Sequence, residues 1–329
     1  MGFWRVGADV LARSRFAVSP LAQTVVSLLV LHRERPVPGR EPWLRAHLPA
    51  YRGRVTANPV ERTLVRAALR PGWLADFMTV PPMESDRTFH DELARIRAAP
   101  AELLFDDLAT ALGGPVPAEL LVPDLPGRAA DLLEWVWAHT VEPEWGRLRR
   151  VFEADIVART GKLGAGGWAE ALNGLRPGLR WLGDGRLRIN GYGYPPLDVA
   201  DDARLLFIPV TGGSWVGWDP PRRYAVVYPC TGLLAEPEGS VLPEALHRLL
   251  GPVRAGILIR LAEPKSTTQL VALTGHGLGS VGGHLKVLLE ARLVRRRRSG
   301  RSMLYYRTPL GDRLVDPGAA GTPEVRDLA

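Results

Sequence analysis

The stretch from residue 246 to residue 308 has an order of elements that few folds accommodate. It reads LHRLLGPVRAGILIRLAEPKSTTQLVALTGHGLGSVGGHLKVLLEARLVRRRRSGRSMLYYRT. Helix-sized segments are followed by two short β-rich runs that hinge on Ser299-Gly300. This order predicts a winged helix-turn-helix over residues 242–315, in which one helix is presented beside a two-stranded ribbon.

Proline, glycine and cap residues divide this segment into its expected elements. They are helices over 243–250, 253–261, 267–273 and 278–291, and strands over 293–298 and 303–307. Ser266 is the expected N-cap of the third helix. The fourth is the expected recognition helix, and its inward stripe is Val281, Leu285, Leu288 and Leu289.

Positive charge is concentrated in the same segment. Residues 242–315 hold 13 lysines and arginines against 4 acidic residues, while residues 1–241 hold 28 of each sign. The net charge of +7 therefore arises from this segment, with a small acidic contribution from residues 316–329. A basic module on a neutral chain favours a polyanionic partner, double-stranded DNA. The alternative is a solvated basic face without a partner.

Several strings in this segment resemble one family of regulators. GPVRAGILIRLAE, HLKVLLEARLV and RRRSGRSMLYYRT are similar, in order and offset, to the winged helix of ArsR-type (arsenical-resistance-repressor) transcription regulators. The resemblance covers roughly residues 243–309. Upstream, AVSPLAQTVVSLLVL and VVYPCTG look like an uncharacterised domain that precedes such winged helices, from which no activity can be transferred.

The resemblance implies which residues face DNA. Those in the helices are Ser266, Thr267, Thr268, Leu278, Gly279, Ser280, Gly282, Gly283, His284 and Lys286, and those in the wing are Arg295, Arg297, Arg298 and Arg301. The family usually has polar side chains where this chain has leucine and glycine. Glycine reaches no base edge. Two consequences remain open: close backbone approach with shape readout, or weak and permissive binding.

Metal sensing, common in that family, is not expected here. Its cysteine position falls on Gln269, Leu270, Val271 and Ala272, and no histidine follows Tyr306. Soft and borderline metals need thiolate or imidazole clusters. His276 and His284 are expected to face DNA or solvent, so the prediction is no metal and no cofactor.

Residues 1–235 are predicted to form a separate, mainly helical domain with a small β-sheet. Helices are expected near 20–31, 58–69, 86–98, 101–112, 126–139 and 144–160. From about residue 186, RLRINGYGY, ARLLFIPV, SWVGW and RYAVVYP are typical of strands. Glu236 to Ser240 is the expected linker, and residues 316–329 are expected to be a disordered tail. The fold class is therefore α+β.

All ten tryptophans precede residue 242. Eight of them are candidates for the walls of an apolar ligand pocket, although we expect most to fill the core. They are Trp73, Trp135, Trp137, Trp145, Trp168, Trp181, Trp215 and Trp218.

The single cysteine, Cys230, excludes an intrachain disulfide and fits a reducing cytoplasm. The apolar stretch from Phe16 to Leu31 contains polar residues and a proline, so a buried helix is expected rather than a signal peptide or a membrane span. The expected location is cytoplasmic.

Enzyme activity is not expected. Cys230 follows an expected strand, but a partner such as His139 or His247 would need to meet it through the fold, and a small buried cysteine is the commoner outcome. The pairs Asp106-Asp107 and Asp201-Asp202 are adjacent in sequence, so their side chains diverge. Gly164 to Gly167 lacks the Gly-Lys-Ser of a phosphate-binding loop and is expected to be an ordinary loop.

The sequence thus predicts a bacterial DNA-binding transcriptional regulator, a homodimeric repressor with a C-terminal winged helix. A small-molecule effector of unknown identity is a candidate partner. In the alternative, the N-terminal domain is a protein-interaction module and senses no small molecule. An enzyme that uses Cys230 is the least favoured hypothesis.

Overall fold

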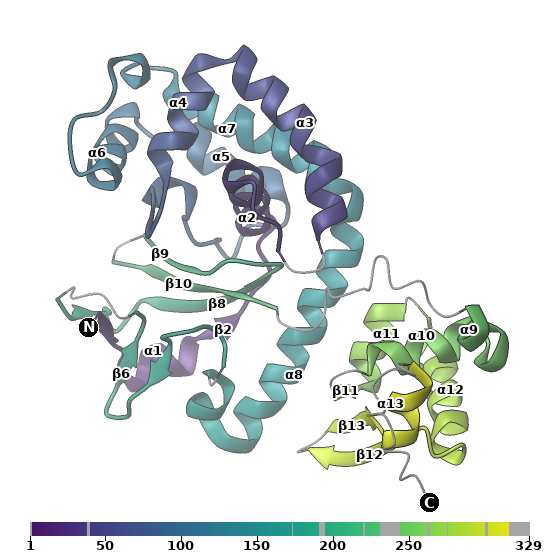
Figure 1. Ribbon diagram of the computed structural model, residues 1–329. Helices are drawn as coiled ribbons and strands as arrows, with labels where there is room; N and C mark the ends of the chain where they lie inside the picture. The colour runs from purple at the N-terminus through teal and green to yellow at the C-terminus, as the bar shows by residue number, and fades with distance from the viewer. Residues whose placement is uncertain are drawn as a thin grey trace, which may run out of the picture. The chain divides into compact units, whose positions relative to one another are not determined.

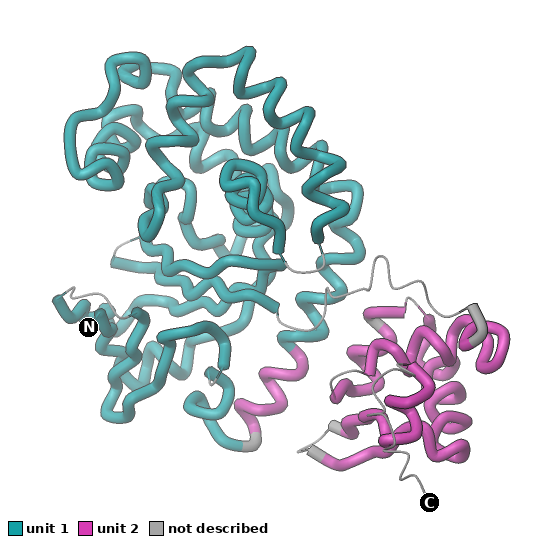
Figure 2. Tube along the Cα trace, in the orientation of Figure 1, with its two compact units in different colours: residues 1–156, 166–235 teal, residues 157–165, 236–329 magenta. Residues whose placement is uncertain are grey.

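The computed structural model describes residues 2–37, 40–172, 174–190, 195–219, 221–230, 244–261, 264–274, 276–299 and 302–315. The chain divides into two compact units, shown in different colours in Figure 2. Unit 1 comprises residues 1–156 and 166–235, and unit 2 comprises residues 157–165 and 236–329. The expected linker at 236–240, the expected tail at 316–329 and Arg301 lie outside the described residues.

Unit 1 is built on two four-stranded sheets. The first has the order β2-β8-β10-β9 and joins Arg15–Phe16, Arg204–Val210, Arg223–Pro229 and Trp215–Asp219. Its central strands β8 and β10 are parallel and almost continuously apolar, as expected of strands covered on both faces. The second has the order β5-β6-β1-β7 and joins Arg180–Trp181, Arg186–Arg188, Phe3–Arg5 and Leu197–Asp198.

Most helices of unit 1 gather on one side of the first sheet, and α1 (Ala8–Arg13) and β6 lie on the other (Figure 1). The gathered helices are α2 (Pro20–Arg33), α3 (Glu41–Ala57), α4 (Pro59–Ala68), α5 (Phe89–Arg97), α6 (Ala101–Leu112) and α7 (Leu125–Val136). Helix α2 contacts β8, α3, α5 and α7, and nearly all of its side chains are buried. The buried helix predicted over 20–31 is confirmed.

Short elements complete this layer. A hairpin pairs β3 (Leu69–Arg70) with β4 (Trp73–Leu74), and 3-10 turns cover Asp76–Met78, Ala118–Leu120 and Glu142–Glu144. Helix α7 continues into a π-helical turn, Trp137–Val141. The apolar stripe predicted for this segment is confirmed, because all of its members are buried: Ala129, Leu132, Leu133, Val136 and Trp137.

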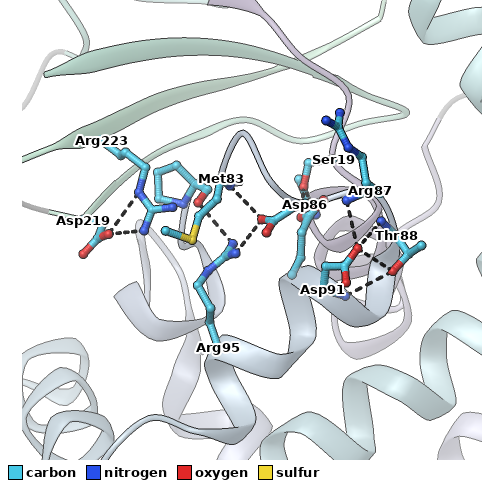
Figure 3. Close-up of polar contacts among 12 residues, drawn as sticks. Ser19, Met83, Asp86, Arg87, Thr88, Asp91, Arg95, Asp219 and Arg223 are labelled. Carbon is cyan, nitrogen blue, oxygen red and sulfur yellow. Dashed lines mark hydrogen bonds and ion pairs between the residues drawn. The ribbon is translucent and has the colours of Figure 1, made fainter.

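Hydrogen bonds fix the start of α5 and the loop before it (Figure 3). The Thr88 hydroxyl accepts from the Asp91 backbone N–H at 3.2 Å, and the Asp91 carboxylate accepts from the Thr88 backbone N–H at 2.8 Å. This reciprocal pair is a capping box. Arg95 forms an ion pair with Asp86, which also accepts from the Met83 backbone N–H at 2.7 Å. The loop is therefore tied to the helix that it precedes.

Two features of unit 1 differ from the sequence-based predictions. Residues 41–57 form α3, a helix that was not predicted, despite Pro49 within it. The segment Gly164 to Gly167, predicted to be a loop, belongs to α8 (Trp145–Leu172). Only Gly167 leaves helical geometry there, at φ 68° and ψ −166°. Glycine adopts this conformation without steric cost, so one residue kinks the helix and the chain resumes it.

In its described residues from Glu244 on, unit 2 contains four helices before a hairpin and one after it. They are α9 (Glu244–Leu250), α10 (Pro252–Arg260), α11 (Thr267–Thr274), α12 (Leu278–Glu290) and α13 (Pro309–Val315). Strands β11 (Lys265–Ser266), β13 (Ser302–Arg307) and β12 (Val294–Ser299) form one antiparallel sheet in that order. The bounds of α9 to α12, β12 and β13 agree with the predicted ones to within one or two residues, whereas β11 and α13 were not predicted.

The core of unit 2 is formed mainly by α10, α11, α12, β12 and β13. Its buried members are Ile257, Leu258, Leu261, Leu270, Val281, Leu285, Leu288, Leu293, Val294 and Tyr305. The predicted inward stripe of residues 278–291 is confirmed at three positions, and Leu289 packs at the edge of the same core. In the described parts of both units, no helix combines the length and hydropathy that crossing a bilayer requires.

Candidate nucleic-acid interface

Helix α11 begins with a reciprocal side-chain cap. The Ser266 hydroxyl accepts from the Gln269 backbone N–H at 3.2 Å, and the Gln269 side-chain oxygen accepts from the Ser266 backbone N–H at 2.7 Å. The predicted N-cap is therefore confirmed. Thr267 is partly exposed and Thr268 is exposed beside this cap. The N-terminal end of α11 thus presents hydroxyl groups and backbone donors to solvent, where an anion is favoured.

Helix α12 has one apolar face and one nearly smooth face. Val281, Leu285 and Leu288 point into the core. The 3.6-residue repeat places Gly279, Gly283 and Lys286 on the opposite side. A Cβ atom added at Gly279, Gly282 or Gly283 would meet nothing within 4 Å. The outward face is therefore open, and its backbone is accessible to a ligand.

The remaining DNA-facing residues predicted on α12 are also at the surface. Leu278 is 62% exposed, Ser280 is exposed and His284 is partly exposed. The Lys286 side chain is 77% exposed and lies 3.9 Å from the Glu290 carboxylate, one turn farther along the helix. Val287, which the sequence analysis did not include, is exposed on the same helix. The solvent face of α12 thus combines apolar groups, bare backbone and one cation.

Strand β12 carries four successive exposed arginines. Its register pairs Arg296 with Tyr305 and Arg298 with Met303, both of which contact the core, whereas Arg295 and Arg297 pair with Tyr306 and Leu304. Directly paired residues share a face of the sheet. Arg295 and Arg297 therefore lie on the face of the sheet away from the core. Arg296 and Arg298 lie on the other face, past the edge of the core.

Few acidic groups lie near these cations. Among the residues that the structure describes, Arg295, Arg296 and Arg297 form no ion pair with a carboxylate. The ion pairs of this unit include those between Lys286 and Glu290 and between Arg307 and Asp312. Exposed guanidiniums without internal carboxylate partners are suited to bidentate contacts with phosphate.

Histidines and acidic residues do not assemble a metal site in the parts of the chain that the structure describes. No group of three or more His, Cys, Asp or Glu side chains with the arrangement of metal ligands occurs there. His276 is exposed and His284 is partly exposed. Chemistry at this surface is therefore the chemistry of cations, hydroxyls and backbone amides.

Unit 1 contains a cavity of about 430 Å³ that no local motif indicated. Three of the eight candidate tryptophans line it: Trp73, Trp215 and Trp218. Of the eight, Trp137 and Trp215 are buried, and Trp168, Trp181 and Trp218 are partly buried against the core of this unit. Trp4 also lines the cavity, together with charged residues that the sequence analysis did not single out, among them Arg33 and Asp76.

Cys230 is buried, as predicted. The suggested partner His139 is exposed, and its ring stacks on Trp135 with centroids 4.4 Å apart. Its Nδ1 lies 2.8 Å from the Trp135 carbonyl oxygen. The imidazole of His139 is therefore held by its own helix turn.

Comparison of the chain with known protein families, with curated proteins and with solved structures gives no match.

Proposed function

We propose that the chain is a DNA-binding transcriptional regulator whose unit 2 contacts duplex DNA through α12 and β12. The observation that carries this proposal is the pairing of an open helix face with an arginine-rich strand. Gly279 and Gly283 leave α12 without protruding side chains, and Arg295 and Arg297 stand exposed on β12. A helix for the major groove and cations for the flanking phosphates are the two parts that such binding needs.

The element order of unit 2 supports a winged-helix reading of this module. Helices α10, α11 and α12 precede the β12–β13 hairpin, and β11 joins the same sheet. Together with the resemblance of residues 243–309 to ArsR-type regulators, this order leads us to propose a repressor of that type. It would act in the cytoplasm as a homodimer without enzymatic activity, and without the metal sensing common in that family.

Dimerisation has a geometric consequence for the target. Two-fold symmetry places two copies of α12 in successive major grooves, so the binding site is a near-palindrome with half-sites about one helical turn apart. If about six phosphates are neutralised per dimer, log affinity falls with log salt concentration at a slope near −5. Genome-wide mapping of bound fragments identifies such a site and the genes beside it.

Two charge-matched variants test the role of β12. Arg295→Ala/Arg297→Ala removes the cations on the outer face of the sheet, and Arg296→Ala/Arg298→Ala removes the same charge from the other face. We expect the first variant to bind the mapped duplex more weakly. Its salt dependence becomes shallower by about 4 units per dimer, because roughly 0.9 unit is lost for each phosphate contact.

Gel-shift titrations at several salt concentrations provide the measurement. Conversion of Arg295 to Arg298 into glutamate should abolish retention while circular dichroism shows an unchanged fold. Unchanged binding by the glutamate variant would remove β12 from the mechanism. Equal losses of affinity in the two alanine variants would mean that β12 attracts DNA only through its overall charge and not through contacts of one face.

A further inference from the structure

The cavity in unit 1 has the size and the walls of a small-ligand site. Its volume of about 430 Å³ lies within the range of typical ligand pockets. The walls come from β1, β4, β9 and the end of α2, elements that are far apart in the sequence. Rigid strands and a buried helix therefore hold the lining residues in place. A site on such elements is preformed.

Indole rings supply most of the apolar wall. Trp4 is 1% exposed, and its ring contacts Tyr224 edge to face with ring centroids 5.4 Å apart. This packing holds the indole in place. Trp73 and Trp218 are half-buried, and each leaves part of its surface toward the cavity or solvent. Flat indole surfaces favour a flat, apolar or aromatic ligand, because offset stacking adds to the burial of apolar area.

Trp215 adds a hydrogen-bond donor to this wall. Its side chain lines the cavity and is only 8% exposed. Within the described structure its indole Nε1 is buried and has no hydrogen-bond partner. Leaving a buried donor unsatisfied costs free energy, about 1–3 kcal/mol in typical cases. An acceptor atom on a bound ligand would satisfy it.

The charged groups of the lining are mostly cationic. Arg33, Arg70 and Arg176 line the cavity, and Asp76 is the acidic residue among the lining residues that the structure describes. The Arg33 guanidinium donates to the Arg70 backbone carbonyl at 3.3 Å, which places it beside the β3–β4 turn. Neither Arg33 nor Arg70 has an ion pair to a carboxylate within the described residues. This part of the lining is suited to an anion.

The electrostatics of individual groups agree with this arrangement. Burial, and next the neighbouring charge of Arg35, lower the pKa of the Arg33 guanidinium. Burial, and next the charge of Asp107, raise the pKa of Asp76 to about 6, although a hydrogen bond from Trp218 opposes the shift. Asp76 is thus engaged by the cavity wall and leaves the arginine charge in excess.

We propose that this cavity binds a flat aromatic carboxylate, with its ring against the tryptophans and its carboxylate at Arg33 and Arg70. The guanidinium groups recognise the carboxylate through charge-assisted hydrogen bonds. The Trp215 indole donates to an acceptor on the same ligand. This proposal concerns unit 1 alone, so it holds or fails independently of DNA binding by unit 2.

Matched acids and amides test it on the full-length chain. Benzoate and naphthoate are titrated by isothermal calorimetry and by tryptophan fluorescence, beside benzamide and naphthamide, which keep the ring and lose the charge. We expect saturable binding of naphthoate with quenching of tryptophan emission. The amide should bind at least about tenfold more weakly, since hydrogen bonds to charged groups contribute that much.

Variants then assign the contacts. Arg33→Gln/Arg70→Gln should weaken naphthoate binding about tenfold and leave naphthamide binding unchanged. Trp215→Phe keeps an aromatic ring and removes the hydrogen-bond donor, so it should weaken the binding of naphthoate. Arg128→Gln, in α7 and outside the cavity lining, is the control for a change of arginine charge and should have no effect.

Three results would overturn the proposal. They are no saturable binding of either acid at millimolar concentration, equal affinity of acid and amide for the unchanged chain, and an unaltered acid-to-amide ratio in the folded arginine variant. Circular dichroism establishes that each variant is folded. DNA binding measured on the same preparations separates a failure of this site from a failure of the proposed function.

Discussion

One pair of substitutions at the glycines on the outward face of α12 can distinguish close backbone approach to DNA from weak, permissive binding. Gly279→Ala/Gly283→Ala adds two methyl groups to a helix surface that has nothing within 4 Å of either position. The change therefore introduces no clash within the protein. Alanine is favoured over glycine in a helix interior by about 1 kcal/mol per position, so α12 should become more stable by about 2 kcal/mol.

The effect on DNA binding should have the opposite sign. If the bare backbone lets α12 approach the base edges closely, two added methyl groups hold the helix away and weaken its contacts. We expect at least about a tenfold loss of affinity, comparable to the cost of a mismatched base pair in a binding site. A more stable helix would then bind DNA less well, a combination that general destabilisation cannot produce.

Amide hydrogen exchange on the full-length chain measures the local stability of α12, and fluorescence anisotropy with the mapped duplex measures affinity at fixed salt. Gly53→Ala is the matched control, because Gly53 lies in α3 and also has nothing within 4 Å. It should slow exchange in α3 and leave DNA binding unchanged. Unaltered or tighter binding by the α12 variant would refute close backbone approach and leave weak, permissive binding. Faster exchange in α12 would refute the steric argument itself.

Two further predictions concern the stability of unit 1. Burial raises the pKa of Glu92 to about 8, because it outweighs the hydrogen bond from Ser19, which lowers the pKa. The folded state therefore holds the carboxyl group neutral. This stabilisation is complete below the unfolded pKa near 4.5 and is lost as the pH rises toward 8. The free energy of unfolding of the unchanged chain should therefore fall by about 3 kcal/mol between pH 5 and pH 7.5. Urea unfolding of Glu92→Gln should not show this fall. Gly217→Ala should destabilise unit 1 by more than about 1 kcal/mol, because the new Cβ would lie 2.2 Å from the Thr79 carbonyl oxygen. A thermal midpoint equal to that of the unchanged chain would contradict this contact.

Sequence periodicity was sufficient for elements whose stabilising contacts are local or strongly patterned. In unit 2, Val281, Leu285 and Leu288 recur at helical spacing, and the cap at Ser266 is a local signal. The bounds of α12 were predictable for that reason. The same holds for α2, where an apolar run follows Ser19, whose side chain accepts from the Ala22 backbone N–H.

Elements stabilised by distant partners left little local signal. Strand β1 has three residues and is defined by pairing with β6 and β7, more than 180 positions later. Helix α3 contains Pro49 and Gly53, residues that argue against a helix when read locally, yet its buried Leu44 and Tyr51 anchor it. Tertiary packing outweighs intrinsic propensity in such cases.

The candidate cavity was unpredictable for the same physical reason. Its lining runs from Gly2 to Trp218, and only Arg70 and Asp76 of its charged lining residues lie close together in the sequence. Tryptophan abundance indicated that aromatic walls were available but not which rings would be exposed to a cavity. The arginines of β12, by contrast, are consecutive, so their shared location was evident from the sequence alone.

The pairing of β1 and β2 with strands from the far end of unit 1 constrains how the chain can fold during synthesis. Phe16 aligns with Phe207, and Trp4 aligns with Leu187 and Leu197. During synthesis, β1 and β2 must therefore wait for nearly the whole unit before their backbone hydrogen bonds to β6, β7 and β8 can form. A nascent chain stalled before β8 would expose unpaired strand edges and the part of α2 that β8 covers, which makes it a natural substrate for chaperones.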